Sequence, residues 1–424
     1  MKVINSYELP QEFFSFKDTQ YFPIVREILN EVKTKGDIAI KHYTNEFDKV
    51  KLDSFVVTEE EIKSSYSEIN KELIPSIKKS IENIEKFSVK QLESFKDFEY
   101  EISPGVITGQ KVIPIERIGV YIPGGRFPLV STVLMCVVPA KVANVNEIAI
   151  FSPPTFNGKI HPAILVACDL VGVKEIYKIG GVQAIGAMAF GTESIKKVDK
   201  IVGPGNKFVA LAKKEVYGIT GIDFIAGPTE VLIIADECAN PKFVASDLIA
   251  QAEHDPDAQP ILITTNKDLA ERVIEEIKTQ LDTIPTKEIA EKSINDNGLI
   301  IIAKDYDEAI YISNKKAPEH LEIDVKNISY FVSKLRNYGS LFIGSFSAES
   351  LGDYSSGINH TLPTNFAARY TGGLSVKDFI KIQTTLYCKK ENFNEIADIA
   401  ITLAETEGLF GHANSLKVRK SYFQ

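Results

Sequence analysis

The chain has 424 residues, of which 44% are hydrophobic and 25% are charged, the composition of an ordinary soluble globular protein. Because a single hydrophobic core stops growing at roughly 250 to 300 residues, this length predicts two or more packed domains. The formal net charge of -9 argues against binding that depends on Lys and Arg neutralising phosphates, so neither nucleic acid nor an anionic membrane is expected as a partner.

Cysteine usage and the N-terminus bear on the cellular compartment. The four cysteines are scattered without C-x-x-C spacing, which indicates neither a disulfide framework nor a thiolate zinc cluster and fits a reducing compartment. Residues 1–17 lack a basic start followed by a sustained apolar stretch, so no signal peptide is expected. No run approaches the ~20 apolar residues of a membrane span. We therefore expect a cytoplasmic protein.

The N-terminal part of the chain is predicted to be mainly helical. Thr58 and Glu61 have the spacing of a capping box, and apolar residues follow at helical intervals. Pro75 is expected to break or kink this helix, and the helical pattern then resumes over residues 77–87. Residues 100–120 are rich in Gly, Pro and Ile, with short alternating stretches suited to strands.

From Val120 onward, apolar strands alternate with helices, which predicts a parallel, doubly wound α/β sheet. The predicted strands are residues 120–122, 147–151, 175–179, 200–202 and 223–225. Glycines at 124, 180 and 203 follow strand ends, where the backbone can approach a ligand, so a dinucleotide site is the natural hypothesis. The G-x-G-x-x-G fingerprint is missing. Either the cofactor binds in an atypical way or these glycines serve turns and helix ends.

A second alternating series predicts a second α/β unit. Its strands are expected at residues 231–234, 261–264, 299–302, 320–323 and 341–343. The tail from Ser375 onward is predicted to be mostly helical, with apolar residues on one helical spacing before Gly408. This tail is a candidate docking arm.

The first candidate site residues lie at the end of a helix. Asn240 can cap this helix with Pro241 at its first position, and Asp255 precedes the proline that ends it. Gln251 and His254 are three residues apart, so they project from one face near the helix C-terminus, where they can converge on one ion. The alternative is a solvated helix end.

Two polar turns supply further candidates. Residues 352–360 are expected to form an irregular loop, in which Asp353 and His360 are candidate ligands or substrate contacts. In residues 407–412, Glu407 and His412 flank the turn that follows the last predicted helix end. An Asx-rich loop and a surface turn are the alternatives.

Glu319 and His320 are adjacent on a short turn before a predicted strand. Histidine, with an unperturbed pKa near ~6.5, suits proton transfer at neutral pH, and a neighbouring carboxylate can activate water. The two side chains can therefore act together as acid and base. The alternative is a partly exposed acid and imidazole pair without a catalytic role.

Taken together, these motifs resemble the histidinol dehydrogenase family over nearly the whole chain and in the family's order. The matching segments are VYIPGG at 120–125, GGVQA at 180–184, VGPGN at 202–206, AGPTE at 226–230, QAEH at 251–254, APEH at 317–320, GDYSSGINH at 352–360 and EGLFGH at 407–412. So many ordered matches are specific. They favour the functional interpretation of each motif over its alternative.

The resemblance implies an α/β fold with two Rossmann-like doubly wound domains, a small N-terminal segment and a helical C-terminal segment. We predict a short N-terminal segment over residues 1–17 and an NAD-binding domain over residues 121–229. Residues 18–120 and 230–374 are predicted to form the other α/β domain, with the catalytic and most metal residues. Residues 375–424 are predicted to form a helical dimerisation arm.

By resemblance, each site residue of the family has a counterpart in this sequence. The implied zinc ligands are Gln251, His254, Asp353 and His412. The implied catalytic pair is Glu319 and His320, and the implied NAD contacts are Tyr121, Gln183 and Asn206. The implied substrate contacts are Thr229, Gln251, His254, His320, Asp353, Glu407 and His412. The family usually has Ser where this chain has Thr229, which keeps the hydroxyl and adds a methyl group.

The activity that the resemblance implies is the NAD-dependent, four-electron oxidation of L-histidinol to L-histidine through L-histidinaldehyde, the last step of histidine biosynthesis. One zinc ion per site would position the substrate. His320 would take the alcohol proton, and Glu319 would activate water for the second oxidation. The resemblance also implies a homodimer in which the C-terminal arm supplies Glu407 and His412 to the neighbouring active site.

Two rival functions belong to other classes. An aldehyde dehydrogenase with a cysteine nucleophile also binds NAD on an atypical α/β domain, but Cys136 lies in an apolar run and has the context of a core residue. A noncatalytic, metal-dependent binding protein is also compatible with this fold class. The adjacent Glu319 and His320 argue against it.

Overall fold

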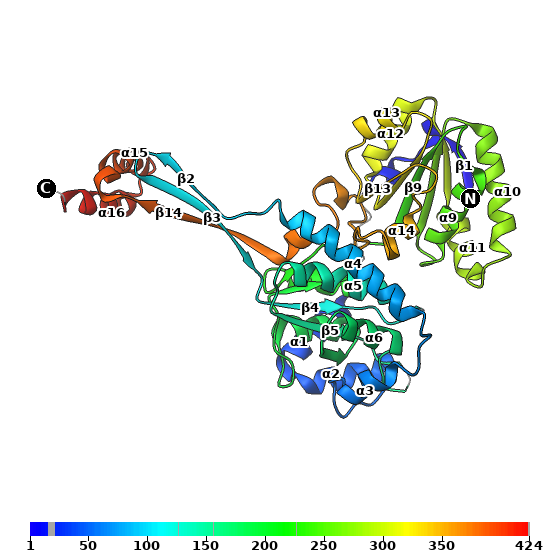
Figure 1. Ribbon diagram of the computed structural model, residues 1–424, viewed down its shortest axis with the longest axis horizontal. Coiled ribbons are helices and arrows are strands. Elements are labelled where there is room, and N and C mark those ends of the chain that lie inside the picture. The colour runs from blue at the N-terminus through cyan, green and yellow to red at the C-terminus, as the bar shows by residue number, and fades with distance from the viewer. Residues whose placement is uncertain (16–21, 126, 156, 226, 423–424) are drawn as a thin grey trace.

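The computed structural model describes residues 1–15, 22–125, 127–155, 157–225 and 227–422. The predicted boundary at residues 17 and 18, and Ala226 at the start of one motif, lie outside the described residues. In the part that is described, the strands form three sheets. Two of them are the centres of separate α/β units, and the third extends from these units as an arm (Figure 1).

A five-stranded parallel sheet forms the first α/β unit, in the order β6-β5-β4-β7-β8. Its strands are β4 (Arg117–Tyr121), β5 (Glu147–Ser152), β6 (Glu175–Lys178), β7 (Lys200–Val202) and β8 (Gly221–Ile222). The first four were predicted. The fifth was wrongly placed at residues 223–225, because the strand ends at Ile222 and the carboxylate of Asp223 instead accepts a hydrogen bond from the Gly203 backbone at 2.8 Å. The strand order reverses between β4 and β7, which is where ligands bind in doubly wound sheets.

Eight helices among the described residues cover this sheet in two layers. The inner layer is α5 (Val130–Val142), α6 (Pro162–Leu170), α7 (Gly181–Phe190) and α8 (Lys207–Val216). The outer layer is α1 (Pro23–Lys35), α2 (Asp37–Tyr43), α3 (Glu59–Ser65) and α4 (Leu73–Leu92). The principal contacts between layers are α1 with α7, α3 with α6, and α4 with α5.

This packing differs from the predicted grouping of residues 18–120 with residues 230–374. Val25, Ile28 and Val32 of α1 belong to the same core as α7 of the five-stranded unit. The physical reason lies in α5 and α7, which are apolar on nearly every face and therefore need a second helical layer to cover the side away from the sheet. The N-terminal helices supply that layer.

Local signals in the outer layer are mostly confirmed. Thr58 and Glu61 form the predicted capping box at the start of α3. The break between helices falls over residues 66–72, earlier than predicted. Pro75 lies in the first turn of α4, where its missing N–H would have no helical partner in any case.

A six-stranded parallel sheet forms the second α/β unit, in the order β1-β11-β10-β9-β12-β13. Its strands are β1 (Lys2–Asn5), β9 (Glu230–Ala235), β10 (Gln259–Thr264), β11 (Leu299–Ile302), β12 (His320–Asp324) and β13 (Ser340–Ile343). Its helices are α9 (Pro241–Ala252), α10 (Lys267–Leu281), α11 (Lys287–Asp296), α12 (Tyr306–Lys316), α13 (Ile328–Lys334) and α14 (Glu349–Tyr354). All five predicted strands are present. The N-terminal residues, predicted as a separate segment, add β1 to the sheet edge.

The arm is a three-stranded antiparallel sheet that ends in two helices. Its elements are β2 (Phe98–Ser103), β3 (Val106–Pro114), β14 (Ile380–Cys388), α15 (Phe393–Thr406) and α16 (Phe410–Ser421). The predicted C-terminal helices are present, and Gly408 with a φ of 76° lies between them. The nine-residue strand β14 was not predicted. Figure 1 shows the arm projecting away from both α/β units.

The segment after α14 connects the two α/β units. The side chain of Asn359 donates to the Met135 carbonyl at 2.7 Å, and the side chain of Asn83 donates to the Ser355 carbonyl at 2.7 Å. These contacts join the segment after α14 to α5 and α4. In the described ranges, no helix is both long enough and apolar enough to cross a lipid bilayer.

Candidate active site

Most predicted site residues meet at the amino ends of β9 and β12. Thr229 directly precedes β9, and His320 is the first residue of β12. Helix α9, capped by the Asn240 side chain as predicted, returns to this edge and places Gln251 in its last turn. Asp353 lies on α14, so residues 352–354 are helical and not part of an irregular loop. Ligands usually bind at the carboxyl ends of parallel strands, so this location could not be inferred from the fold class.

Glu319 is a buried carboxyl group with two hydrogen-bond donors. Its Oε2 accepts from the Thr229 hydroxyl at 2.5 Å and from the Glu230 backbone N–H at 3.0 Å. Burial raises the pKa of Glu319 to about 8, because the charged form loses its hydration. A carboxyl group that titrates near neutrality is suited to accept a proton from water.

His320 presents one free nitrogen to the site. Its Nδ1 lies 3.3 Å from the Glu230 carbonyl oxygen, and since a carbonyl can only accept, Nδ1 carries the proton. The other nitrogen, Nε2, is buried without a hydrogen-bond partner and lies 3.8 Å from Oδ1 of Asp353. Burial lowers the pKa of His320 to about 3, which keeps the ring neutral. Nε2 is therefore available as a base.

Glu230 and Lys316 fix the positions of the two catalytic candidates, Glu319 and His320. The Glu230 backbone contacts Glu319 through its N–H and His320 through its carbonyl. Its side chain forms an ion pair with Lys316, and the two side chains are only 1% and 4% exposed. Sequence reasoning assigned no role to either residue. The available signal was that Glu230 is the last residue of the AGPTE motif and that Lys316 directly precedes the APEH motif.

Three imidazoles surround the Asp353 carboxylate. His254 Nε2 lies 3.9 Å from Oδ2, and His320 lies near Oδ1 as described. His360 donates through Nδ1 to the Asp353 backbone carbonyl at 3.2 Å. Burial raises the pKa of Asp353 to about 7 and lowers that of His360 to about 4. Neutral imidazoles around a carboxylate are the donor types that zinc binds.

The Gln251 amide is fully buried and connects the metal candidates to Glu319. In the orientation that satisfies all its neighbours, Nε2 donates to a Glu349 carboxylate oxygen at 2.5 Å. Oε1 then accepts from the Glu230 N–H at 2.9 Å and lies 2.5 Å from the Thr229 hydroxyl oxygen, so Gln251 and Glu319 compete for the single Thr229 hydroxyl proton. In the opposite orientation Nε2 donates to the Thr229 hydroxyl at 2.5 Å and Oε1 faces Glu349.

Glu349 was missed by sequence reasoning. His254, Glu349 and Asp353 each offer one ligand atom, and these atoms lie within 4.8 Å of one another. Burial raises the pKa of Glu349 well above its usual range, and the nearby Asp353 raises it further. This set of nitrogen and oxygen donors fits a divalent ion such as zinc. The signal in the sequence was the four-residue spacing from Asp353, which has meaning only if the segment is helical.

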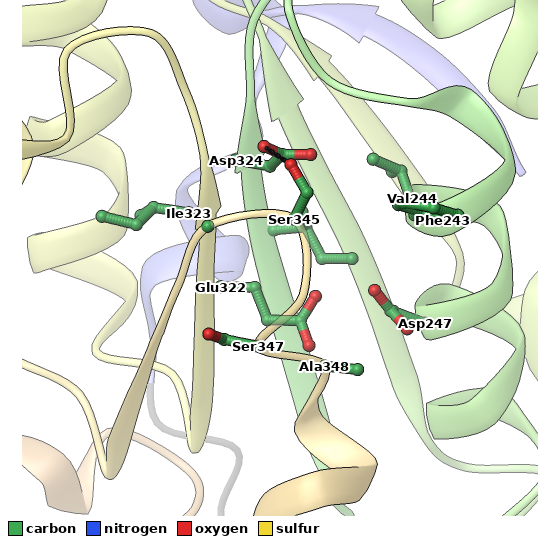
Figure 2. A pocket seen from close by; sticks show the side chains of 11 residues that line it. Phe243, Val244, Asp247, Glu322, Ile323, Asp324, Ser345, Ser347 and Ala348 are labelled. Atoms are coloured by element: carbon green, nitrogen blue, oxygen red, sulfur yellow. Dashed lines mark hydrogen bonds between the residues drawn. The ribbon is translucent and has the colours of Figure 1, made fainter.

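A small pocket lies between α9 and β12, beside the start of α14 (Figure 2). The carboxyl groups of Asp247 and Glu322 point toward one another across it. Glu322 also accepts a hydrogen bond from the Glu349 backbone N–H at 2.7 Å. Burial raises the pKa of Asp247 to about 6 and that of Glu322 well above its usual range. Through this hydrogen bond, Glu322 holds the first turn of α14 in place.

The candidate NAD contacts lie at the carboxyl edge of the five-stranded sheet. Tyr121 ends β4 and Asn206 follows β7, so they flank the point where the strand order reverses. Asn206 uses its Oδ1 to cap α8, accepting from two backbone N–H groups at 3.0 and 3.1 Å. Gln183, in α7, has a buried Oε1 with no hydrogen-bond partner in the structure. An orphaned amide oxygen at this edge is compatible with a polar ligand.

The glycine turn between β7 and α8 is fixed from both sides. Gly203 has a φ of 112°, and a Cβ atom there would lie 2.2 Å from the Tyr121 carbonyl oxygen. Its N–H donates to Asp223 at 2.8 Å, and its carbonyl accepts from Lys213 at 2.9 Å. Lys213 and Asp223 form an ion pair whose side chains are 3% and 1% exposed. The turn that leads to Asn206 is thus held by a buried charge pair.

Two predicted site residues lie elsewhere in this chain. Glu407 follows α15, and His412 is in α16, at the far end of the arm. Figure 1 shows these helices well separated from α9 and α14. Within one chain the structure therefore brings together six of the predicted residues and leaves these two apart. The six are Thr229, Gln251, His254, Glu319, His320 and Asp353.

Comparison with known proteins identifies the family of this chain. The sequence profile of histidinol dehydrogenase matches residues 14–420. The chain belongs to the histidinol dehydrogenase family. It is 51% identical over 400 residues to the histidinol dehydrogenase of Methanocaldococcus jannaschii, with 94% of this chain and 92% of the relative covered. It is 48% identical over 405 residues to that of Clostridium acetobutylicum, with 95% and 93% covered.

A solved structure supports the same assignment. The crystal structure of histidinol dehydrogenase from Elizabethkingia anophelis is similar with a TM-score of 0.94 at 40% sequence identity, covering 100% of this chain and 98% of that one. Membership in the histidinol dehydrogenase family makes the chain an oxidoreductase that uses NAD, and not a noncatalytic binding protein. The cysteine rival also fails, because Cys136 is buried in the core and burial raises its pKa to about 12.

Proposed function

We propose that this chain oxidises L-histidinol to L-histidine through L-histidinaldehyde, with two successive hydride transfers to NAD+, as the last step of histidine biosynthesis in the cytoplasm. The observation that carries this proposal is the free Nε2 of His320, which is buried without a partner beside the candidate metal carboxylate of Asp353. A neutral imidazole in this position is a base for the substrate hydroxyl.

The proposed zinc ligands are Gln251, His254 and Asp353 of one chain, together with His412 of a second copy. These nitrogen and oxygen donors, with no thiolate among them, would hold zinc in this site. When bound, zinc supplies a Lewis-acidic anchor that can hold the imidazole and amino groups of the substrate. Specificity for histidinol follows from this two-point attachment, because a primary alcohol without both groups lacks the same anchor.

His320 and Glu319 carry the proton chemistry. In the first oxidation, Nε2 of His320 takes the hydroxyl proton while the hydride leaves the same carbon for NAD+, which yields the aldehyde. Glu319 then takes a proton from a water molecule as the water oxygen bonds to the aldehyde carbon. As the water adds, the proton held by His320 passes to the carbonyl oxygen and completes the hydrate, which leaves His320 neutral again. In the second oxidation His320 takes a proton from the hydrate as the second hydride leaves for NAD+. The raised pKa of Glu319, about 8, lets this carboxyl group hold the water proton near neutrality.

The proposed NAD contacts are Tyr121, Gln183 and Asn206. With its Oδ1 occupied by the α8 cap, Asn206 has only its Nδ2 hydrogens to offer. Gln183 offers its unpartnered Oε1. The same edge serves both oxidations, because the first NADH must leave before the second NAD+ binds.

The proposed assembly is a homodimer in which each arm completes the other copy's site. The arm exposes large apolar side chains, with Leu386 at 72%, Phe410 at 68% and Leu403 at 60% exposure. Large exposed apolar side chains on one arm favour contact with another chain. Glu407 and His412 lie on the same arm and would reach the neighbouring substrate pocket. Mixing a His412→Ala variant with a His254→Ala variant is expected to restore activity, because one of the two sites in a mixed dimer is then intact.

The decisive test of the reaction is NADH formation followed by absorbance. The expected result is two NADH for each L-histidinol consumed, with loss of activity in a chelator and recovery on adding zinc. The Glu319→Gln variant is expected to slow oxidation of added L-histidinaldehyde. No NADH formation by the zinc-loaded protein would contradict the proposed function, and unchanged aldehyde oxidation in Glu319→Gln would contradict the role of Glu319.

A further inference from the structure

The first α/β unit has no acidic residue where a dinucleotide-binding fold usually holds one. In such folds an Asp or Glu about 20 residues after the glycine turn accepts a hydrogen bond from a ribose hydroxyl group. Glu147 is the one acidic residue between Gly125 and Asp169. It lies at the amino end of β5, the edge opposite the candidate NAD contacts, and its carboxylate lies 2.8 Å from both Arg117 and Lys196. A carboxylate for the ribose must therefore come from another part of the chain.

The segment that follows α2 brings Asp48 to the carboxyl edge of this sheet. Farther along this segment, the Phe55 carbonyl accepts from the Lys178 N–H at 2.7 Å, at the carboxyl end of β6. The pairing is antiparallel, so the residues before Phe55 continue beyond the end of the strand. Val50 accordingly lies beside Gly158 in the connection after β5, where a Cβ atom on the glycine would lie 3.4 Å from Val50 Cγ1. Asp48, two residues earlier, thus lies beyond the ends of these strands.

The Asp48 carboxylate has no partner that the structure records. Its Oδ2 is buried without a hydrogen-bond partner in the part of the chain that is described. Two other carboxylates at this edge each pair with a lysine, Glu61 with Lys178 at 3.1 Å and Asp223 with Lys213. Burial raises the pKa of Asp48 to about 6. A buried acceptor of this kind points to a donor outside the protein, which a bound ligand or a water molecule can supply.

Asp48 lies beside the candidate NAD contacts. The pKa of Tyr121 is raised to about 12 by burial and, to a smaller extent, by the negative charge of Asp48, so the two side chains are close. The Tyr121 hydroxyl accepts from the Gly181 N–H at 3.1 Å. The Oε1 of Gln183 and the hydroxyl of Ser152, at the end of β5, are also buried without partners. Three unpartnered polar groups at one edge fit a ligand that carries several hydroxyl groups.

The position of Asp48 favours the adenosine half of NAD+ over the nicotinamide half. The nicotinamide must come within about 3.5 Å of the reacting carbon, which lies beside His320 in the six-stranded unit. Asp48 follows α2, and Figure 1 shows α2 on the side of the first unit away from the six-stranded sheet. The ribose nearest to Asp48 is therefore that of the adenosine.

We propose that the Asp48 carboxylate accepts a hydrogen bond from the adenosine 2′-hydroxyl of NAD+ and thereby selects NAD+ over NADP+. The proposal rests on the proposed NAD site and adds the residue that determines the choice of cofactor. The same carboxylate repels the 2′-phosphate of NADP+, because both groups are negatively charged.

The test measures the binding of NAD+, of NADP+ and of the NAD+ analogue without the adenosine 2′-hydroxyl to the full-length protein by isothermal titration calorimetry. The wild type is expected to bind NAD+ more tightly than the other two. Asp48→Ala is expected to raise the dissociation constant for NAD+ about 10- to 100-fold, the loss typical of a hydrogen bond to a charged group. Its constant for the analogue is expected to stay within about threefold of the wild type. The matched control is Asp53→Ala, which removes an exposed carboxylate from the same segment and is expected to change neither constant.

Asp48→Asn tests the choice between the two cofactors. It keeps an acceptor oxygen but removes the charge, so it is expected to bind NADP+ at least about threefold more tightly than the wild type. An unchanged NADP+ constant in this variant would overturn the selection of NAD+ by Asp48.

The outcomes with Asp48→Ala decide whether the carboxylate binds the ribose. If the folded variant, as judged by circular dichroism, binds NAD+ as the wild type does, or loses affinity equally for NAD+ and the analogue, the proposal is overturned. If the variant does not fold, equal affinity of the wild type for NAD+ and the analogue would overturn it. Wild-type protein that binds none of the three dinucleotides would instead contradict the proposed function.

Discussion

Replacing Lys316 by Met tests how much the active site depends on its buried ion pair. The side chains of Lys316 and Glu230 are 4% and 1% exposed, so the variant leaves Glu230 charged and uncompensated in the interior. Breaking a buried pair from one side costs about 3 to 5 kcal/mol. For a unit of roughly 200 residues, this corresponds to a decrease of roughly 6 to 20 °C in melting temperature.

The assay is thermal unfolding of the metal-free protein by circular dichroism, because the chain has no tryptophan. Lys196→Met is the matched control, since the Lys196 and Glu147 side chains are 64% and 44% exposed and an exposed pair contributes about 0 to 1 kcal/mol. Adding Glu230→Gln to Lys316→Met is expected to recover part of the loss by removing the unpaired charge. A Lys316→Met variant that melts within about 2 °C of Lys196→Met would refute the reasoning.

Three further predictions follow from the site. Because burial raises the pKa of Glu319 from 4.5 to about 8, its contribution to the stability of the metal-free protein is fully present below pH 4.5 and is lost as the pH rises through about 8. Melting temperatures across this range should fall less steeply in Glu319→Gln, and equal slopes would contradict the assignment. Thr229→Val removes a hydroxyl that can donate to Glu319 and is expected to slow aldehyde oxidation roughly 10- to 100-fold. Thr229→Ser keeps the hydroxyl and is expected to oxidise the aldehyde at close to the wild-type rate. Equal rates in the two variants would exclude a role for the hydroxyl. Lys213→Met removes the hydrogen bond to the Gly203 carbonyl and is expected to raise the KM for NAD+ about tenfold without changing the KM for histidinol. The control Lys214→Met, at an exposed lysine, is expected to change neither constant. A parallel rise in both constants would argue against a specific effect on NAD+.

The strands and the α9 helix could be predicted because their signals are local. Residues 261–264 are an apolar run that is buried on both faces, and Asn240 followed by Pro241 marks a helix start without reference to the rest of the chain. The same locality explains why Gln251 and His254 lie near one another, although α9 ends at Ala252 and His254 lies in the turn that follows and not on the helix as predicted. For these residues, spacing along the chain is also proximity in space.

The missed features depend on partners distant in sequence. Helix α14 has no side-chain cap of its own, and its first N–H group, that of Glu349, donates to Glu322 on β12. Without that partner, the glycines and serines after Glu349 indicate a loop, so the spacing between Glu349 and Asp353 had no meaning. Strand β14 is similar, because most of its side chains are exposed and its pairing with β3 defines it. Sequence pattern gives the apolar face of α1 but not the helix that it covers.

The strand pairing also determines the order in which the chain can fold during synthesis. All strands of the five-stranded sheet have been made once residue 222 is complete, so this unit can assemble early. Strand β1 must wait for β11 at residues 299–302, and the β2–β3 hairpin must wait for β14 at residues 380–388. Until then β3 presents an open edge to other nascent chains. Strand β14 thus covers the edge of a hairpin that is synthesised much earlier.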